Sequence, residues 1–343
     1  MSAGLLVETV DRLLAERCTP EALELAEAEG WCGPAWDGLV EAGFTRIALP
    51  ETVGGSGGSL SDAADVLRVV GRWAAPVPLA ETAFLGGWLL ARAGLALPDG
   101  PLTVVPDDLA LTAGQIAGTA RVAWAGRSSA IVALVSGPDG ALVVQIDPAE
   151  ADISPGFNMA GESRETVRFE VPLERTRWAP APTGVDAASL RRRGALSRIL
   201  LMAGAVEAMS QLTIEYTRGR HQFGQPIARF QAVQQHLVVA AEGAAALSMA
   251  ADLAVRALER GPAELEIAAA KVIADEVAVA ATRAAHQAHG AMGLTQEYPL
   301  HRLTRALWSW RHEYDHARNW NRQLGALALG AGANGLFPLI TAH

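Results

Sequence analysis

The residues whose types and spacing are best suited to ligand chemistry lie in the segment 215–237, which reads EYTRGRHQFGQPIARFQAVQQHL. Arg220 and Gln222 fall at the expected end of one helix, and Pro226 falls at the expected start of the next. A guanidinium beside the free amide groups of a helix N-terminus can bind a diphosphate through charge-assisted hydrogen bonds. Taken alone, such a turn is more often an ordinary corner between helices that carries a surface arginine.

A second candidate lies downstream, where Gln287 precedes a chain break that contains Gly290 and Gly293. Glycine lets a backbone approach a phosphate closely, because it has no side chain in the way. The alternative interpretation of Gln287 is a solvated helix end. Both segments are therefore suited to the phosphates of a ligand, provided that the flanking helices hold them in place.

Other clusters carry weaker signals. His312 and His316 are spaced like two histidines of a zinc-binding helix, but no third ligand stands at a meaningful spacing, so a surface pair is expected. The glycine-rich stretch 54–58 lacks the lysine and the preceding strand of a phosphate loop, which favours a structural turn. The sequence therefore predicts no metal site.

Helices are expected at both ends of the chain. Apolar residues recur at helical spacing through residues 1 to about 96, where Ser59 or Ser61 caps a helix that runs toward Trp73. Four long helices with short connections in the C-terminal half predict an up-and-down four-helix bundle. These segments are rich in alanine and leucine and are broken by glycine or proline: 187–221, 226–260, 262–290 and about 298–330.

The middle of the chain, about 97–182, changes to short β-rich runs at 102–105, 130–137, 141–147 and 166–171. Pro-Asp-Gly between the second and third runs predicts a hairpin. A small antiparallel β-domain or barrel is expected here. The predicted fold class is α+β, mostly α, with domains over 1–96, 97–184 and 185–343.

Composition narrows the classes of function. The chain has 343 residues, and its 28 basic and 37 acidic residues give a net charge of −9, which disfavours nonspecific binding to nucleic acid or to an anionic membrane. Two cysteines cannot staple a chain of this size, so a reducing cytoplasm is expected. The run 323–343 is long enough to span a bilayer, but its glycines and proline favour a helix that ends near Gly330 and a packed tail.

Three motifs, taken in order, resemble the acyl-CoA dehydrogenase family over nearly the whole chain. The family turn R-x-x-F-G-x-x-(I/L)-x-x-(F/H)-Q is present at 220–231, and a Q-x-x-G-(G/A)-x-G segment begins at Gln287. The phrase LPETVGGSGGSL at 49–60 is similar to the family's LPE-x-x-GG-x-GG. The family has a helical domain, a β-domain and a four-helix bundle in this order, which agrees with the fold expected above.

The resemblance implies acyl-CoA as substrate and FAD as cofactor, with each FAD lying across a subunit interface. It also implies that the bundle contacts the ADP half of FAD. Ala291 replaces the more common glycine of the second motif, which is a small change. The residues that the resemblance assigns to cofactor binding are Arg220, Gln222, Phe223, Gln231, Gln287, Gly290 and Ala291.

The β-region departs from the family. It contains neither the T-E-P-x-x-G-S-D-like loop nor the W-I-(T/S)-like strand that the family places against the isoalloxazine ring. Trp124 is therefore interpreted as a core or interface residue and not as the family's flavin-stacking tryptophan. Nothing in 97–182 supplies the expected contacts to the flavin ring.

The family's catalytic base is also out of place, so no catalytic residue is predicted. A carboxylate must remove the α-proton of the thioester, but the first bundle helix has no acid before Glu207, and the later slot falls on Tyr314. Glu313 precedes this slot by one residue, which on a helix is a rotation of about 100°. It is expected to be a solvated or salt-bridged acid beside Arg311.

Without the flavin-ring motifs and the catalytic base, the chain resembles the short subunit of the heteromeric (α2β2) actinobacterial sterol side-chain acyl-CoA dehydrogenases. The resemblance implies a full-length homologue as partner, which supplies the flavin-ring loops and the glutamate. Two alternatives stay open: a self-sufficient homomeric enzyme that uses Glu313, and a non-catalytic scaffold that binds no flavin. The apolar bundle residues expected to face a partner are Leu200, Leu201, Val206 and Leu212.

Overall fold

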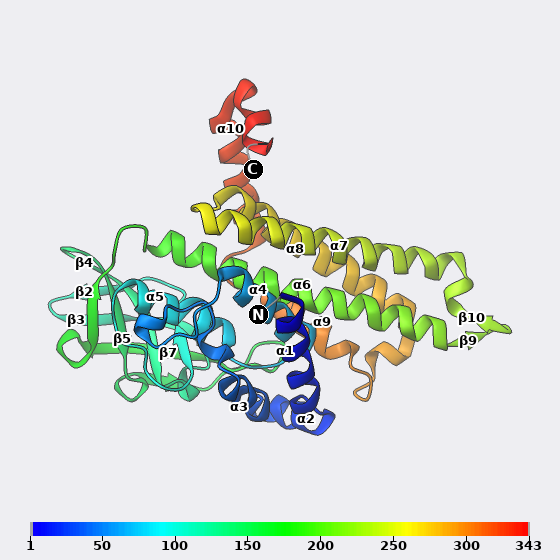
Figure 1. Ribbon diagram of the computed structural model, residues 1–343, viewed down its shortest axis with the longest axis horizontal. Helices are drawn as coiled ribbons and strands as arrows, with labels where there is room; N and C mark the ends of the chain where they lie inside the picture. Colours follow the sequence, from blue (N-terminus) through cyan, green and yellow to red (C-terminus); the bar gives the residue numbers. More distant parts are fainter. Residues whose placement is uncertain (1–2, 342–343) are drawn as a thin grey trace. The chain divides into compact units, whose positions relative to one another are not determined.

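The computed structural model describes residues 3–341 (Figure 1). These residues divide into two compact units. The first unit comprises residues 3–67 and 75–197, and the second comprises residues 68–74 and 198–341. The first unit contains the N-terminal helices and the sheet, and the second contains the long C-terminal helices. The division into domains over 1–96, 97–184 and 185–343 stays a prediction.

The N-terminal region is helical, as the apolar spacing predicted. On the first helix Leu6, Val10 and Leu14 are buried and form its inner face. Ser59 and Asp62 form the predicted cap: the Ser59 hydroxyl accepts a bond of 3.0 Å from the Asp62 amide, and the Asp62 carboxylate accepts one of 2.7 Å from the Ser59 amide. The helices are α1 (Ala3–Arg17), α2 (Pro20–Glu29), α3 (Gly33–Glu41), α4 (Leu60–Arg72), the π-helix η3 (Ala80–Gly86) and α5 (Gly87–Arg92).

The glycine-rich stretch 54–58 is a structural turn, as expected. A Cβ atom at Gly55 would lie 2.1 Å from the carbonyl oxygen of Leu49, so only glycine fits there. Gly54 has φ 85°, in the left-handed region that other residues rarely adopt.

The central sheet has eight strands, in the order β6-β7-β3-β2-β4-β5-β8 with β1 beside β4. The expected hairpin joins β4 to β5 across Pro138 and Asp139, with Gly137 paired to Gly140. Most strand pairs are antiparallel, as predicted, but β4 pairs in parallel with β1 and β2. The strands are β1 (Leu102–Val104), β2 (Leu109–Thr112), β3 (Gln115–Ala123), β4 (Ala130–Gly137), β5 (Gly140–Ile146), β6 (Asp152–Ser154), β7 (Arg164–Pro172) and β8 (Arg177–Pro180).

Strand β3 is long, yet the sequence patterns did not predict it. It carries three alanines and a glycine, which have low β-propensity. Pairing with β7 along its whole length compensates for this, because Ile116 and Val122 lie in the same core as Val167 and Phe169. Tertiary pairing, not local preference, therefore determines this strand.

The C-terminal unit is built on long helices, but its fourth predicted helix is wrong. The segment 298–330 is interrupted at 311–316, where Tyr314 (φ 54°) and Asp315 (φ 86°) leave the helical region. The last helix also continues past Gly330, although Gly332 is not helical, and Phe337 is 75% exposed, so the expected packed tail is wrong too. The helices are α6 (Ala187–Gly219), α7 (Gln231–Arg260), α8 (Glu264–His289), α9 (Leu300–Trp310) and α10 (Ala317–Thr341).

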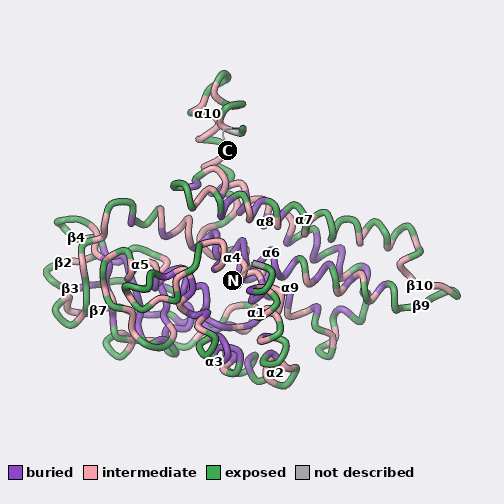
Figure 2. The backbone as a smooth tube through the Cα atoms, in the orientation of Figure 1, coloured by how far each residue is buried: buried purple, intermediate pink, exposed green. Residues whose placement is uncertain are grey.

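The apolar residues that were expected to face a partner subunit lie wholly or partly inside this chain. Leu200, Leu201 and Val206 are buried within the chain itself, and Leu212 is partly buried. Several exposed apolar side chains of the C-terminal unit lie instead on α7, much of which is exposed in Figure 2, and others lie on α8 and α10. Those on α7 include Val238, Val239, Met249 and Leu253.

Among the described helices, α7 alone is long and apolar enough to cross a membrane by length and composition. Its buried positions include Ala240, Leu247 and Ala254. Core helices of soluble proteins pass the same test of length and composition.

Candidate flavin site and the loop 311–316

The predicted arginine turn is a tight β-hairpin. Strands β9 (His221–Gln222) and β10 (Gln225–Pro226) pair antiparallel, and the Ile227 amide donates to the Arg220 carbonyl over 2.8 Å. The two turn residues, Phe223 and Gly224, have φ values of 53° and 79°. Two positive φ angles are the mark of a type I′ turn, and a phenylalanine in this conformation is unusual. Such residues are frequent at ligand sites.

Pro226 was expected to start the next helix, and this is wrong. It pairs with His221 in the hairpin, and a 3₁₀ turn at Ile227–Arg229 follows. Helix α7 begins only at Gln231, and Phe230 precedes it without a side-chain cap. The N-terminal amides that can face an anion therefore belong to Gln231 and its neighbours.

The side chains of the turn are available to a ligand. Arg220, Gln222 and Phe223 are exposed, Phe223 by 92%. The guanidinium of Arg220 makes no ion pair or side-chain hydrogen bond with any residue between 3 and 341. The ring of Phe223 meets Phe230 edge-on, with 6.1 Å between centroids. An arginine without an acidic partner beside an uncapped helix start is suited to a diphosphate.

The second predicted segment lies at the C-terminal end of α8. Gln287, Gly290 and Ala291 are all exposed. Gly290 has φ 58° and ψ −140°, and a Cβ atom added to it would meet nothing within 4 Å. This backbone conformation is open almost only to glycine, and the open space beside it suits a closely approaching ligand.

Gly293 is required for a different reason from the one expected. It is buried, and a Cβ atom there would lie 2.9 Å from a methyl group of Leu300 and 3.0 Å from the Cβ atom of His289. Its absent side chain makes room for packing within the chain and not for a phosphate.

The two segments meet through aromatic side chains that the sequence analysis did not single out. Tyr216 of α6 stacks on His289, the last residue of α8, with ring centroids 4.5 Å apart. The carbonyl of Tyr216 accepts the Arg220 amide over 2.8 Å, and His289 directly precedes Gly290. The structure thus brings the end of α8 against the helix that leads into the arginine turn.

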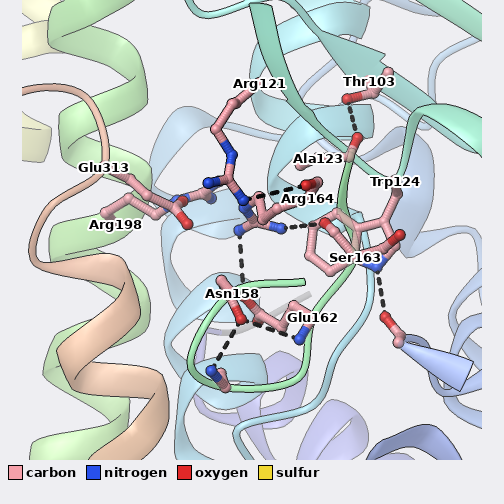
Figure 3. Close-up of polar contacts among 12 residues, drawn as sticks. Thr103, Arg121, Ala123, Trp124, Asn158, Glu162, Ser163, Arg164, Arg198 and Glu313 are labelled. Atoms are coloured by element: carbon pink, nitrogen blue, oxygen red, sulfur yellow. Dashed lines mark hydrogen bonds and ion pairs between the residues drawn. The ribbon is translucent and has the colours of Figure 1, made fainter. Parts of the chain in front are cut away.

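The loop 311–316 lies where the family's base was sought, and Glu313 is fixed in it by an ion pair. Its carboxylate accepts a hydrogen bond of 2.5 Å from Nε of Arg198, whose side chain is only 3% exposed (Figure 3). Arg311, the expected neighbour of Glu313, pairs instead with Asp275 over 2.7 Å. The salt-bridged interpretation of Glu313 is therefore correct, but the partner is different.

Buried Lys271 of α8 holds the same loop. Its Nζ atom donates to the carbonyls of Trp310, over 3.3 Å, and of Glu313, over 3.0 Å. Burial lowers the pKa of Lys271 to about 8, and the charge of Glu313 partly offsets this effect. Arg198 also lies over the ring of Tyr314, 5.3 Å from its centroid. Ion pairs and carbonyl contacts thus fix the loop, and the carboxylate of Glu313 is engaged in them.

We expect Glu313→Gln to lower the turnover of the assembled enzyme less than tenfold, which corresponds to less than about 1.4 kcal/mol. The reason is that the carboxylate serves an ion pair, whereas loss of a general base costs about 10²–10⁴-fold. Turnover per bound flavin is the measurement. Asp275→Asn is the matched control, because it removes the neighbouring ion pair. A loss above a hundredfold in Glu313→Gln alone would place the base on this chain.

Trp124 is a core residue, as interpreted. Its indole N–H donates to the Gly30 carbonyl over 2.9 Å, and the guanidinium of Arg164 lies 4.8 Å from its ring centroid (Figure 3). Arg164 in turn pairs with Glu162 over 3.2 Å, and both side chains are at least nine-tenths buried. The ring is only 3% exposed and is therefore not available for stacking on a cofactor.

The histidine pair of the loop 311–316 is exposed. The Nδ1 atoms of His312 and His316 are 3.1 Å apart. Within residues 3–341 no three histidine, cysteine, aspartate or glutamate side chains form a group that could hold a metal ion.

Comparison with known proteins connects these features to one family. Residues 3–96 match "Acyl-CoA dehydrogenase, N-terminal domain", and residues 191–311 match "Acyl-CoA dehydrogenase, C-terminal domain". Acyl-CoA dehydrogenase IpdE2 of Mycobacterium tuberculosis is 32% identical over 320 residues, which cover 87% of this chain and 88% of that protein.

Solved structures show the same fold. The ChsE4–ChsE5 complex from Mycobacterium tuberculosis superposes with a TM-score of 0.87 at 25% identity, and the match covers 96% of this chain and 97% of that one. A variant of the Tcur3481–Tcur3483 steroid acyl-CoA dehydrogenase superposes with a TM-score of 0.84 at 22% identity, over 96% and 99% of the two chains.

Proposed function

Because the chain belongs to the acyl-CoA dehydrogenase family, whose members oxidise a CH–CH bond of an acyl-CoA, we propose that it is the ADP-binding subunit of a heteromeric enzyme. FAD is the cofactor implied by the family. In this proposal the chain holds the ADP half of FAD, and a full-length homologue supplies the loops around the flavin ring and the catalytic glutamate.

The observation that carries the proposal is the contrast between the two halves of the site. The residues proposed for the ADP half are accessible: Arg220 is exposed without an acidic partner in the described chain, and Gly290 presents an open backbone. For the catalytic half, the chain offers Glu313, which is paired with Arg198, and Trp124, which is buried under Arg164. Such a chain is suited to holding FAD but not to removing a proton from the substrate.

The residues have separate roles in this arrangement. Arg220 and the first amides of α7 would hold the diphosphate, because both present positive potential. Gln222, Gln231 and Gln287 would orient the ADP moiety through neutral hydrogen bonds, Phe223 would cover it, and the backbone at Gly290 and Ala291 would close around it. When bound, FAD accepts the hydride that leaves the β-carbon of the acyl group.

A bulky acyl group, of the steroid side-chain type, is the substrate class that we propose. One of the structural neighbours is itself described as a steroid acyl-CoA dehydrogenase, and another is a complex of two different chains. An α2β2 assembly with fewer flavins than chains would leave space for a large acyl group at the partner's site. The cytoplasm is the proposed location.

The two alternative functions, a homomeric enzyme and a flavin-free scaffold, predict different states of Glu313 and of the Arg220 turn. A homomeric enzyme that uses Glu313 would have to release this carboxylate from Arg198. A scaffold subunit that binds no flavin would leave the open turn at Arg220 without a ligand.

The test is co-expression with a full-length homologue from the same genome, followed by counting of FAD per chain. We expect the chain alone to be colourless and the complex to contain fewer flavins than chains. Stoichiometric FAD in the isolated chain would favour the homomeric enzyme. A complex whose flavin content is unaffected by changes at Arg220 would favour the scaffold.

A further inference from the structure

Three aromatic side chains form a cluster beneath the proposed flavin site. His289 is 3% exposed and stacks on Tyr216 at 4.5 Å, with 22° between the ring planes. Tyr298 closes the cluster, with its centroid 5.1 Å from His289 and 5.7 Å from Tyr216. The cluster therefore joins the last turns of α6, the end of α8 and the segment that precedes α9.

The hydrogen bonds of His289 fix the position of its Nδ1 proton and are compatible with a neutral ring. Its Nδ1 atom lies 2.8 Å from the Ala285 carbonyl, which can only accept, so Nδ1 carries the proton. Its Nε2 atom lies 3.3 Å from the Tyr298 hydroxyl, and in the neutral ring this nitrogen accepts. The contacts are thus satisfied by the neutral imidazole, with the tyrosine as donor.

The surroundings favour the same neutral state. Burial lowers the pKa of His289, and the charge of His286 on the same helix lowers it further, while the bond to Ala285 acts in the opposite direction. Burial also raises the pKa of Tyr298, with added effects from Tyr216 and Glu215 of α6. His301 of α9 is a further titratable neighbour, with its Nδ1 atom 2.8 Å from the Tyr298 carbonyl, and Glu297 directly precedes Tyr298 in the chain.

This cluster is connected directly to both parts of the proposed flavin site. The carbonyl of Tyr216 accepts a hydrogen bond from the amide of Arg220, and His289 directly precedes Gly290 in the chain. His289 also packs tightly against Gly293, since a Cβ atom added to Gly293 would lie 3.0 Å from the Cβ atom of His289. A shift of the His289 ring would therefore move the Gly290 backbone relative to the Arg220 turn.

We propose that His289 is a positioning residue for the cofactor: as a neutral ring between Tyr216 and Tyr298, it fixes the α8 end against the Arg220 turn, and its protonation loosens FAD. The inference rests on the proposed function. The neutral ring stabilises this arrangement fully above about pH 6.5, the ordinary histidine pKa. The contribution is lost as the pH falls below that value, because the unfolded or loosened segment then binds a proton that the packed segment excludes.

The first test is the pH dependence of the FAD dissociation constant of the assembled complex. We expect the wild-type Kd to rise about tenfold from pH 7.5 to pH 5.5, and we expect this rise to be absent in His289→Gln, whose amide does not titrate. His312→Gln is the matched control, because it removes an exposed histidine whose Nδ1 atom contacts His316 in the loop 311–316. A rise that persists in His289→Gln, or one that disappears in His312→Gln, would overturn the inference.

A second test needs no flavin. Amide hydrogen exchange in the full chain should become at least about tenfold faster at residues 287–294 when the pH falls from 7.5 to 5.5, after correction for the intrinsic rate. His289→Gln should show no such change. If Arg220→Ala leaves FAD binding unaffected while exchange behaves as expected, the proposed function fails and the role of His289 in this segment holds. If Arg220→Ala releases FAD and exchange does not depend on His289, only the present inference fails.

Discussion

Arg220→Ala should weaken FAD binding by the assembled complex by roughly 10- to 150-fold. A hydrogen bond to a charged group contributes about 1.5–3 kcal/mol, and this range converts to that loss of affinity. Arg220 has no acidic partner in the described chain, so the substitution removes a ligand contact without leaving a protein charge unpaired. Absorbance at 450 nm per assembled complex after gel filtration is the measurement.

Two variants define the specificity of this effect. Gln287→Ala should lose flavin only partly, because a neutral hydrogen bond contributes about 0.5–1.5 kcal/mol. Arg260→Ala should retain it, since Arg260 is exposed at the opposite end of α7. Over 30 residues this helix measures about 45 Å. Full flavin in an intact Arg220→Ala complex would show that the family's role does not extend to this turn.

Gly204→Ala should destabilise the chain by about 3 kcal/mol or more, at the upper end of what overpacking costs. In the second unit the end of α4 crosses α6 closely, and each helix has a glycine that faces the backbone of the other helix at the crossing. A Cβ atom at Gly204 would lie 1.9 Å from the Arg68 carbonyl oxygen, and one at Gly71 would lie 2.0 Å from that of Leu201. Because the obstructing atoms belong to the backbone, a side-chain rotation cannot relieve the clash.

Thermal unfolding checks this prediction, with an expected decrease in Tm of about 4 °C or more for a chain of 343 residues. Gly219→Ala is the control on the same helix, because a Cβ atom there meets nothing within 4 Å. It should leave Tm unchanged or raise it slightly, since alanine is about 1 kcal/mol more favourable than glycine in a helix. Equal stability of Gly204→Ala and wild type would mean that the two helices do not cross as closely as described.

Local sequence determined the elements whose signals are contained in a few neighbouring residues. The cap formed by Ser59 and Asp62, the hairpin at Pro138 and Asp139, and the turn at 54–58 were all predictable, because their hydrogen bonds close within a short stretch. The family motifs likewise identified the enzyme class from residue types and spacing. The assignment of individual residues to FAD stays a prediction from those motifs.

Only the tertiary structure decided the features that depend on distant partners. Strand β3 exists because β7 pairs with it, and the loop 311–316 interrupts a helical pattern because Lys271 and Arg198, from two other helices, bind its carbonyl and carboxylate groups. In the sequence His289 is a residue without an assigned role in the motif that begins at Gln287. Its contact with Tyr216 forms only when α6 and α8 pack together. The identity and order of the chemical groups were thus evident from the sequence. Long-range packing fixed which of them are held by the protein itself and which remain open to a ligand, because burial and charge pairing are properties of neighbours in space.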